Sequence, residues 1–383
     1  MGFTELIGER YLWIDQLCIV QDNIQHKTYL ISNMDRIYKG ALCTIVAADS
    51  NVHSVGLSGF RPKSRNYDPV SGTIDNVDLI IAEPDIDIDS YDSPLGTSAW
   101  NKRGWTYQEF MLSSRIYVFV GGRVYYQCTR GVVGEAEPGR NLGRFYTISG
   151  GHKRYDREPF AHYGELVRQY TNRILTFPED ILHAFAGLMS DFSDRFGSEF
   201  CYGLPTNHIY FGLMWKTVTG NNNEMARRDG FPSWSWAGWF NAVEYDMNLA
   251  FKSLNVHIEW RDPKIDWNTV QRTGALEFRT QVVLLNREEY PQTFEAYQLD
   301  QYNWGGMDLD MDDNREEWNG GPWECLKIAH MYQGDDDGPE HGASGLLVVK
   351  EIKPGIYQRE GFVEAFTPWV DRFESTVKDI ILV

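Results

Sequence analysis

The chain has 383 residues, of which 36 are Lys or Arg and 54 are Asp or Glu, which gives a formal net charge of −18. A surface this acidic repels phosphate backbones and anionic lipids, which disfavours general nucleic-acid or membrane-surface binding, although a local basic pocket could still hold a nucleotide. The five cysteines are odd in number and widely spaced, and no stretch approaches the length of an apolar membrane span. We therefore expect a cytoplasmic protein without a disulfide scaffold, a zinc site or a transmembrane helix.

The first elements alternate between strand and helix. The apolar run from Tyr11 to Ile14 predicts a buried strand that ends at Asp15. A helix is expected over 27–39, and the partly β-branched run over 43–48 predicts a second strand. Strand, helix and strand in this order form a βαβ unit, which implies a parallel sheet with a right-handed crossover.

The middle of the chain contains a hairpin and several helices. After a loop-rich connection with one strand at 77–82, a short helix is expected over 106–112. Strands at 116–120 and 124–128 flank Gly121-Gly122, which is a strong hairpin signal. Helices are predicted over 159–174, 179–192 and 207–215, after a Gly-rich linker at 135–151.

The rest of the chain is predicted to be β-rich. Strands are expected at 235–239, 255–260, 275–285, 345–350, 361–365 and 379–383. The Trp, Gly and Asp stretch over 303–323 is interpreted as a surface insertion, and the acidic residues within it and after it as solvated loops rather than a calcium site.

Three sequence blocks carry more information than the fold class. They are Leu12-Trp13-Ile14-Asp15-Gln16-Leu17-Cys18 followed by Met34-Asp35-Arg36-Ile37-Tyr38; Arg103-Gly104-Trp105-Thr106-Tyr107-Gln108-Glu109; and Phe231-Pro232-Ser233-Trp234-Ser235-Trp236, which lies downstream of Leu175-Thr176 and Asp180. In wording, order and spacing they resemble the heterokaryon-incompatibility (HET) domain proteins of filamentous fungi. The resemblance extends over about residues 10–130 and 160–240. It departs from the family at one point: a Ser-Tyr-x-Trp-Gly block that normally precedes the first of these blocks is absent, through truncation or loss.

The resemblance implies an α/β fold similar to Toll/interleukin-1 receptor (TIR) domains: a flavodoxin-like parallel sheet with helices on both faces. We expect this HET domain over 1–133, a helical segment over 134–230 and a β-rich region over 231–383. The family is linked to non-self recognition and programmed cell death, and some TIR domains hydrolyse NAD through a glutamate. NAD is therefore expected as a substrate rather than as a permanently bound cofactor.

Glu109 is the preferred catalytic candidate. A carboxylate of this kind can stabilise the oxocarbenium-like ribosyl centre that forms as nicotinamide leaves, as carboxylates do in glycosidases. Arg103 could bind a phosphate with its guanidinium fork, Trp105 could stack on a base, and Gln108 is placed with them around the nucleotide. The alternative is a structural Arg103–Glu109 ion pair with Trp105 in the core.

Two further residues of the first block are candidates. Asp15 is expected at the carboxyl end of a strand, where ligands bind in open α/β sheets, and there it would act on the ribose or as a base. Its alternative role is to cap the following loop. Cys18 is assigned to the nucleotide site, but a catalytic thiol needs a base and only His26 is near in sequence, so a buried structural cysteine is favoured.

The third block invites a nucleophile at Ser235, but it lacks the surroundings of a nucleophile elbow. Alternation would place Trp234 and Trp236 on one face of a strand, as core residues that seal a contact between domains. The histidines show no metal-ligand spacing, so no metal site is expected.

Three functions remain open. The chain could be an NAD-consuming toxin, a non-catalytic signalling module that self-associates or binds other death-signalling proteins through Trp-rich surfaces, or a HET-type scaffold recruited to small-molecule biosynthesis.

Overall fold

The computed structural model describes residues 1–49, 56–60, 64–65, 71–75, 77–80, 93–135, 142, 159–218, 226–245, 254–257, 265–285, 323–333, 343–366 and 370–383. Nearly all of the predicted linker (135–151) and of the predicted insertion (303–323) lies outside these residues. The chain divides into an N-terminal unit, Met1–Asp156 with Arg173–Asp191, and a C-terminal unit, Arg157–Asn172 with Phe192–Val383. The domain boundaries expected from the sequence, after residues 133 and 230, stay a prediction.

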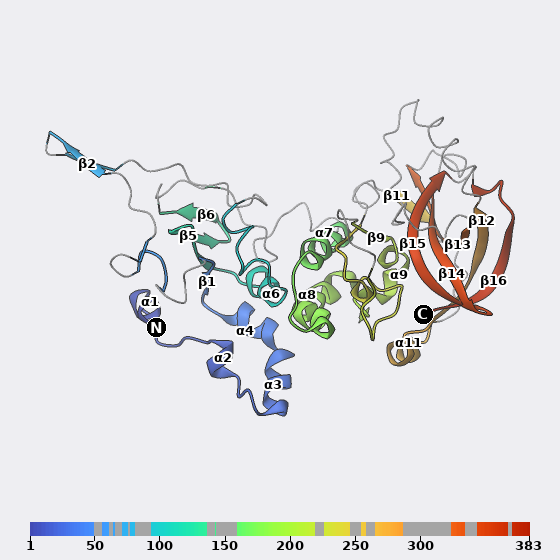
Figure 1. The fold of residues 1–383 in the computed structure, drawn as a ribbon, viewed down its shortest axis with the longest axis horizontal. Coiled ribbons are helices and arrows are strands. Elements are labelled where there is room, and N and C mark those ends of the chain that lie inside the picture. Colours follow the sequence, from blue (N-terminus) through green and yellow to red (C-terminus); the bar gives the residue numbers. More distant parts are fainter. Residues whose placement is uncertain are drawn as a thin grey trace. The chain divides into compact units, whose positions relative to one another are not determined.

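The N-terminal unit combines short helices with a sheet and a separate hairpin (Figure 1). Its elements are α1 (Gly2–Leu6), α2 (Asp15–Cys18), α3 (Ile24–Ile31), α4 (Met34–Gly40), β1 (Thr44–Ala47), β2 (Ser71–Ile74), β3 (Val77–Ile80), α6 (Trp105–Met111), β4 (Ile116–Val120), β5 (Arg123–Cys128), β6 (Gly131–Gly134) and the 3-10 turns η2 (Pro178–Ile181) and η3 (His183–Phe185). Helix α8 (Ala186–Phe196) begins in this unit.

The main sheet of this unit has the strand order β1-β4-β5-β6 and is mixed. Strands β1 and β4 are parallel, with Thr44 opposite Ile116, whereas β4–β5 and β5–β6 are antiparallel. The predicted hairpin is confirmed: Gly121 and Gly122 join β4 to β5 with φ angles of 61° and 75°, values that glycine adopts without strain. The resemblance had implied a parallel sheet, whereas the observed sheet is mixed.

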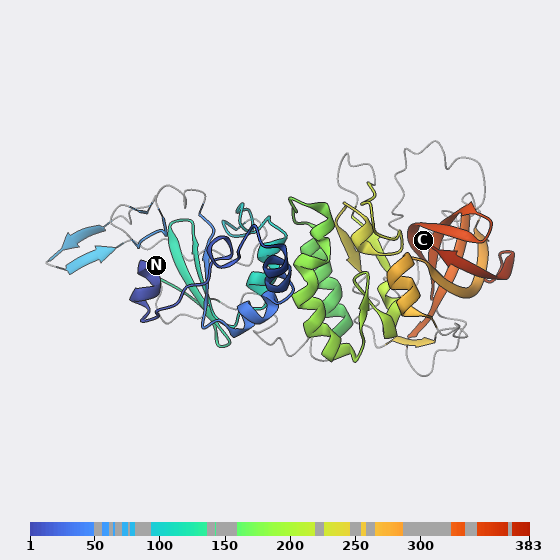
Figure 2. The ribbon, with the colours of Figure 1, turned by 90° about the horizontal axis from the view of Figure 1, so that it is seen from below.

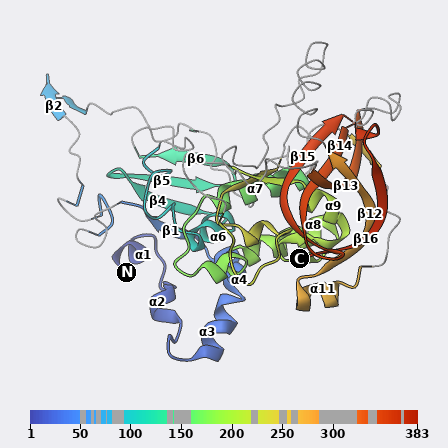
Figure 3. The same cartoon turned by 45° about the vertical axis from the view of Figure 1, so that its right-hand side comes forward.

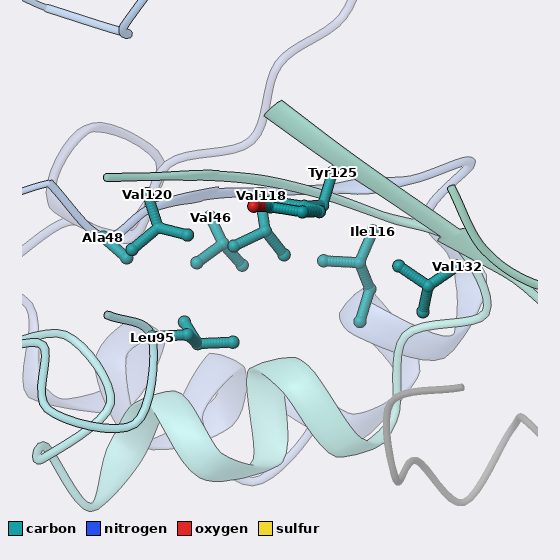
Figure 4. Close-up of a cluster of buried hydrophobic side chains, with 8 residues drawn as sticks. All are labelled: Val46, Ala48, Leu95, Ile116, Val118, Val120, Tyr125 and Val132. Carbon is teal, nitrogen blue, oxygen red and sulfur yellow. The ribbon is translucent and has the colours of Figure 1, made fainter. Parts of the chain in front are cut away.

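Both faces of the sheet are covered. On one face, side chains of all its strands meet Leu95 and the partly buried Trp100 and Phe110, and the result is one apolar core (Figure 4). On the other face, the ring of Phe3 from α1 lies 5.1 Å from the rings of Tyr117 and Phe119. Alternation along β4 thus supplies two cores, which confirms the α/β class.

The strand predicted over 11–14 is not formed. Ile14 is extended, with φ −137° and ψ 124°, but it is the N-cap of α2 and its carbonyl accepts from Leu17 and Cys18. An apolar run of four residues does not separate a strand from a helix entry, and here the local hydrogen bonds decide. The helix predicted over 27–39 is also divided: α3 ends at Ile31 and α4 begins at Met34.

The C-terminal unit begins with a helical layer. Its first elements are α7 (Pro159–Thr171), the remainder of α8, β7 (Phe200–Cys201), β8 (Leu204–Pro205), η4 (Thr206–His208), α9 (Ile209–Gly212), β9 (Trp215–Thr217), η5 (Trp236–Gly238) and β10 (Val243–Tyr245). Aromatic rings fill its interior: Phe160 of α7 lies 5.1 Å from Phe211 and 5.3 Å from Tyr245. Helix α7 matches the helix predicted over 159–174.

The C-terminal strands close into a barrel, which Figures 2 and 3 show from two directions. Its elements, with the strand and helix that precede it, are β11 (Leu254–His257), α11 (Trp267–Thr273), β12 (Leu276–Leu285), β13 (Trp323–Gln333), β14 (Ala343–Lys353), β15 (Ile356–Phe366) and β16 (Ser375–Leu382). The order β13-β12-β16-β15-β14 returns to β13 through a β13–β14 pairing. From Leu276 to Val282 along β12, buried residues alternate with more exposed ones, as a strand with one face on a core requires.

No helix in the part of the chain that the structure describes is long and apolar enough to cross a bilayer.

Candidate functional site

Helix α6, which carries Glu109, is held in place by a segment around Ile174, which lies far from it in sequence. The Gly104 amide donates to the carbonyl of Ile174 (2.8 Å), and the Ile174 amide donates to the carbonyl of Lys102 (2.7 Å). A Cβ on Gly104 would lie 2.4 Å from Cδ2 of Leu175, so only glycine permits this approach. The second sequence block therefore pairs structurally with Leu175, which lies well upstream of the third block in the sequence.

The same segment holds the aromatic side chains of α6. The indole of Trp105 is half-buried and donates to the Asp180 carboxylate (3.3 Å). The guanidinium of Arg173 lies 4.5 Å from the ring centre of Tyr107 and donates to the side-chain oxygen of Asn101 (2.7 Å). Trp105 thus keeps part of its ring exposed while its polar tip is fixed.

Glu109 lies near the end of α6 and is partly exposed. The pKa of its carboxyl is raised to about 7. Burial is the main cause of the increase and the Asp15 carboxylate adds to it, whereas Arg103 and, to a smaller extent, a hydrogen bond from Tyr38 oppose it. A carboxyl with this pKa exchanges its proton near neutrality, which is the property expected of a group that acts in catalysis.

Tyr38 of α4 is the principal site residue that the sequence analysis missed. Its hydroxyl is hydrogen-bonded to the Glu109 carboxyl, and burial, followed by the nearby carboxylates of Glu109 and Asp15, raises the pKa of Tyr38 above its usual range. The ring of Trp13 packs edge-on against it, with centroids 5.9 Å apart. One signal was available: Tyr38 lies within the helix predicted over 27–39, and a phenol that becomes buried needs a partner for its hydroxyl.

Asp15 and Arg103 lie near enough to Glu109 for their charges to act on its carboxyl. Both are exposed. Asp15 is the first residue of α2 rather than the end of a strand, and its Oδ1 accepts from the amide of Gln16 (2.8 Å). The capping role that was its alternative is therefore present, together with the proximity to Glu109.

The site lies toward the amino ends of the parallel strands. The carbonyl of Glu109 accepts from the hydroxyl of Ser113 (2.6 Å), which in turn is hydrogen-bonded to the hydroxyl of Thr44, the first residue of β1. The expectation that Asp15 marks the carboxyl end of a strand is therefore wrong.

Cys18 and Gln108 do not join this group. Cys18 is exposed, contrary to the expected burial, and its sulfur accepts from the amide of Ile14 (3.5 Å). The Nδ1 of His26 already accepts from the amide of Val20 (3.2 Å), so this nitrogen is not available as a base for the thiol. Gln108 is only 1% exposed, and its Oε1 lies 3.1 Å from the place of a Cβ on Gly187. The structure does not offer Gln108 to a ligand.

The third block is structural and belongs to the C-terminal unit. Residues 236–238 form the 3-10 turn η5 instead of the predicted strand. Trp234 and Trp236 are fully buried, as core residues should be, and their indoles donate to the carbonyl of Gly274 (2.9 Å) and to the hydroxyl of Tyr163 (3.1 Å). The hydroxyl of Ser235 is also buried, and it donates to the carbonyl of Tyr202 (2.6 Å). Ser235 is therefore a turn residue without access to a substrate.

Within the described residues, no three His, Cys, Asp or Glu side chains gather in a way that could hold a metal ion.

Comparison with known proteins gives one match. Residues 1–109 match the family model described as heterokaryon incompatibility protein (HET), and this range includes Asp15, Tyr38, Arg103 and Glu109. No curated protein and no solved structure matches the chain. This match identifies residues 1–109 as similar to a heterokaryon incompatibility (HET) domain.

Proposed function

We propose that the HET domain cleaves the nicotinamide–ribosyl bond of NAD and that this reaction is the output of a cell-death response to non-self. One observation carries the proposal: the partly exposed Glu109 carboxyl, with a pKa of about 7, lies beside Asp15 and Arg103 inside the HET match. The HET match supports the role in the response to non-self, and the Glu109 carboxyl supports cleavage of the nicotinamide–ribosyl bond.

The reaction needs a group that tolerates and stabilises positive charge. When the bond between C1′ of the ribose and the pyridinium nitrogen breaks, its electron pair passes to the ring, and neutral nicotinamide leaves. The ribosyl centre becomes oxocarbenium-like, water adds to C1′, and the water gives up one proton. The products are nicotinamide, ADP-ribose and a proton.

Glu109 would serve this reaction in its ionised form. A carboxylate stabilises the developing charge on the ribosyl centre, and a carboxyl with a pKa of about 7 can accept the proton of the attacking water. Asp15 adds negative charge next to it. Arg103 is the exposed cation of the group and suits the pyrophosphate, and the exposed part of the Trp105 ring suits the base.

A second candidate is a non-catalytic, self-associating module. Among the described residues, Trp234, Trp236 and Trp215 are buried and so do not contribute to the Trp-rich surface expected for such an interface. Exposed apolar side chains occur instead on α2 and α3, where Leu17 is 70% and Ile24 80% exposed and neither helix buries a residue. Assembly in light scattering without NAD turnover is the result that favours this candidate.

Nicotinamide release from NAD by the full chain tests the proposal. We expect turnover by the wild type, its loss in Glu109→Gln, and full retention in Ser235→Ala, since Ser235 is sealed in the C-terminal unit. Glu5→Gln is the charge-matched control, because Glu5 is an exposed carboxylate of α1. Equal turnover by Glu109→Gln and wild type contradicts the proposal.

A further inference from the structure

We infer that Trp105 binds the positively charged pyridinium ring of the substrate and that Asp180 positions Trp105 for this contact. The Asp180 carboxylate holds the indole, whose ring stays partly exposed one helical turn from Glu109. The inference deepens the proposed function and rests on it for its role in turnover. The binding step can be measured with a ligand that contains no bond to cleave.

The hydrogen bond of Trp105 differs from those of the tryptophans in the C-terminal unit. Trp215, Trp234 and Trp239 are at most 4% exposed, and each donates its indole N–H to a backbone carbonyl, as a buried indole requires. Trp105 is only half-buried, so water can satisfy its N–H, yet the Asp180 carboxylate accepts from it (3.3 Å). Burial therefore does not require this bond, and its effect is to fix a ring that solvent reaches.

Asp180 is itself held firmly beside α6. It lies in η2, which begins at Pro178, and its amide donates to the carbonyl of Phe177 (3.1 Å). The Gly104 amide donates to the carbonyl of Ile174 (2.8 Å), which joins the segment before η2 to the start of α6. A carboxylate with this support restricts the indole to a narrow range of orientations.

The spacing on α6 indicates which ring of NAD meets Trp105. Trp105 and Glu109 are four residues apart on the helix, so they lie on the same side of it with Cβ atoms about 6 Å apart. In NAD the pyridinium nitrogen is bonded directly to C1′ of the ribose, the atom that Glu109 serves in the proposed reaction. The adenine lies beyond two riboses and the pyrophosphate. The ring one helical turn from Glu109 is therefore the nicotinamide.

Charge gives this contact its selectivity. The face of Trp attracts a cation more strongly than any other side-chain ring, whereas a neutral nicotinamide gains only the stacking part of the contact. The carboxylates of Asp15, Glu109 and Asp180 outnumber the Arg103 cation, so the surroundings also favour a positive ring. Because the ring loses its charge when nicotinamide leaves, the contact favours substrate binding and product release.

Two small probes test the contact: 1-methylnicotinamide, which carries the cationic ring without a ribosyl bond, and neutral nicotinamide. Their binding to the full chain is followed through the ¹⁵N–¹H resonance of the Trp105 indole, assigned by its loss in Trp105→Phe. We expect both probes to shift this resonance, and 1-methylnicotinamide to bind about two- to fivefold more tightly than nicotinamide.

Variants of η2 test the role of Asp180. Asp180→Ala should weaken the binding of 1-methylnicotinamide about two- to fivefold, and Asp180→Asn, which keeps an acceptor for the indole, should restore most of it. Glu179→Ala is the charge-matched control, because it removes the exposed carboxylate next to Asp180, and it should leave binding unchanged. In NAD turnover, Asp180→Ala should raise KM by about the same factor without lowering kcat.

The outcomes separate this inference from the proposed function. Equal affinity for the two probes, or no shift of the Trp105 resonance, overturns the inference even if the wild type cleaves NAD, and this comparison needs no Asp180 variant to fold. Equal weakening by Glu179→Ala and Asp180→Ala also overturns it, because charge rather than position would then explain the loss. Preferential binding of 1-methylnicotinamide without NAD turnover supports the Trp105 contact and removes the proposed reaction.

Discussion

Glu109→Gln should stabilise the N-terminal unit at neutral pH while it abolishes activity. The pKa of Glu109 is about 7 in the folded protein, against an ordinary value of 4.5 for a glutamate side chain. Between these values the folded state holds a proton that the unfolded state has released, so stability falls as pH rises through this window and is constant above it. The difference corresponds to about 3 kcal/mol, an upper limit because the side chain is partly exposed and screened by solvent. Glutamine does not ionise and avoids this loss.

Hydrogen exchange of α6 peptides in increasing urea measures this effect, since it reports the unfolding of the N-terminal unit alone. The advantage of Glu109→Gln over wild type should be small near pH 4.5 and should grow to a maximum of about 3 kcal/mol by pH 8. Glu5→Gln, compared in the same way, corrects for the change in net charge. An advantage of Glu109→Gln that does not vary with pH would refute the assignment of a buried, proton-holding carboxyl to this position.

Two further substitutions test the neighbouring structure. In Gly104→Ala the new methyl group would lie 2.4 Å from Leu175, so the free energy of unfolding of the N-terminal unit should fall by about 1–3 kcal/mol in the same exchange assay. Adding Leu175→Ala should restore part of this stability. An unchanged stability in Gly104→Ala argues against the close contact. Ser235→Ala removes hydrogen bonds to Tyr202 and Ala237 and should cost the C-terminal unit about 1–3 kcal/mol in urea unfolding followed by tryptophan fluorescence; loss of NAD turnover at unchanged stability would speak for a catalytic serine.

Several elements could be predicted because local sequence decides them. The Gly121-Gly122 turn determines its hairpin because both glycines adopt positive φ angles, and the helix predicted over 159–174 corresponds to α7. The strand expected at 11–14 failed because Ile14 gives its carbonyl to α2. The strand at 235–239 failed because Ser235 accepts from the Ala237 amide and so closes a 3-10 turn.

The site was predicted in part. The order of the blocks was enough to suggest that Glu109, Asp15 and Arg103 act together. The charges of Asp15 and Arg103 do act on the Glu109 carboxyl. The Tyr38 contact was not predictable, because it depends on how α4 packs on α6. Burial of Gln108 was equally hidden: residues 108 and 109 are adjacent, yet Gln108 packs against Gly187 and is buried, whereas Glu109 is partly exposed.

The pH dependence of NAD cleavage by the wild-type chain is the most direct test of the central claim, that ionised Glu109 drives the reaction. We predict single-turnover nicotinamide release that rises with pH around a midpoint of about 7 and reaches a plateau above it. A rate that stays level from pH 5 to pH 9, or no release at any pH, would contradict the claim.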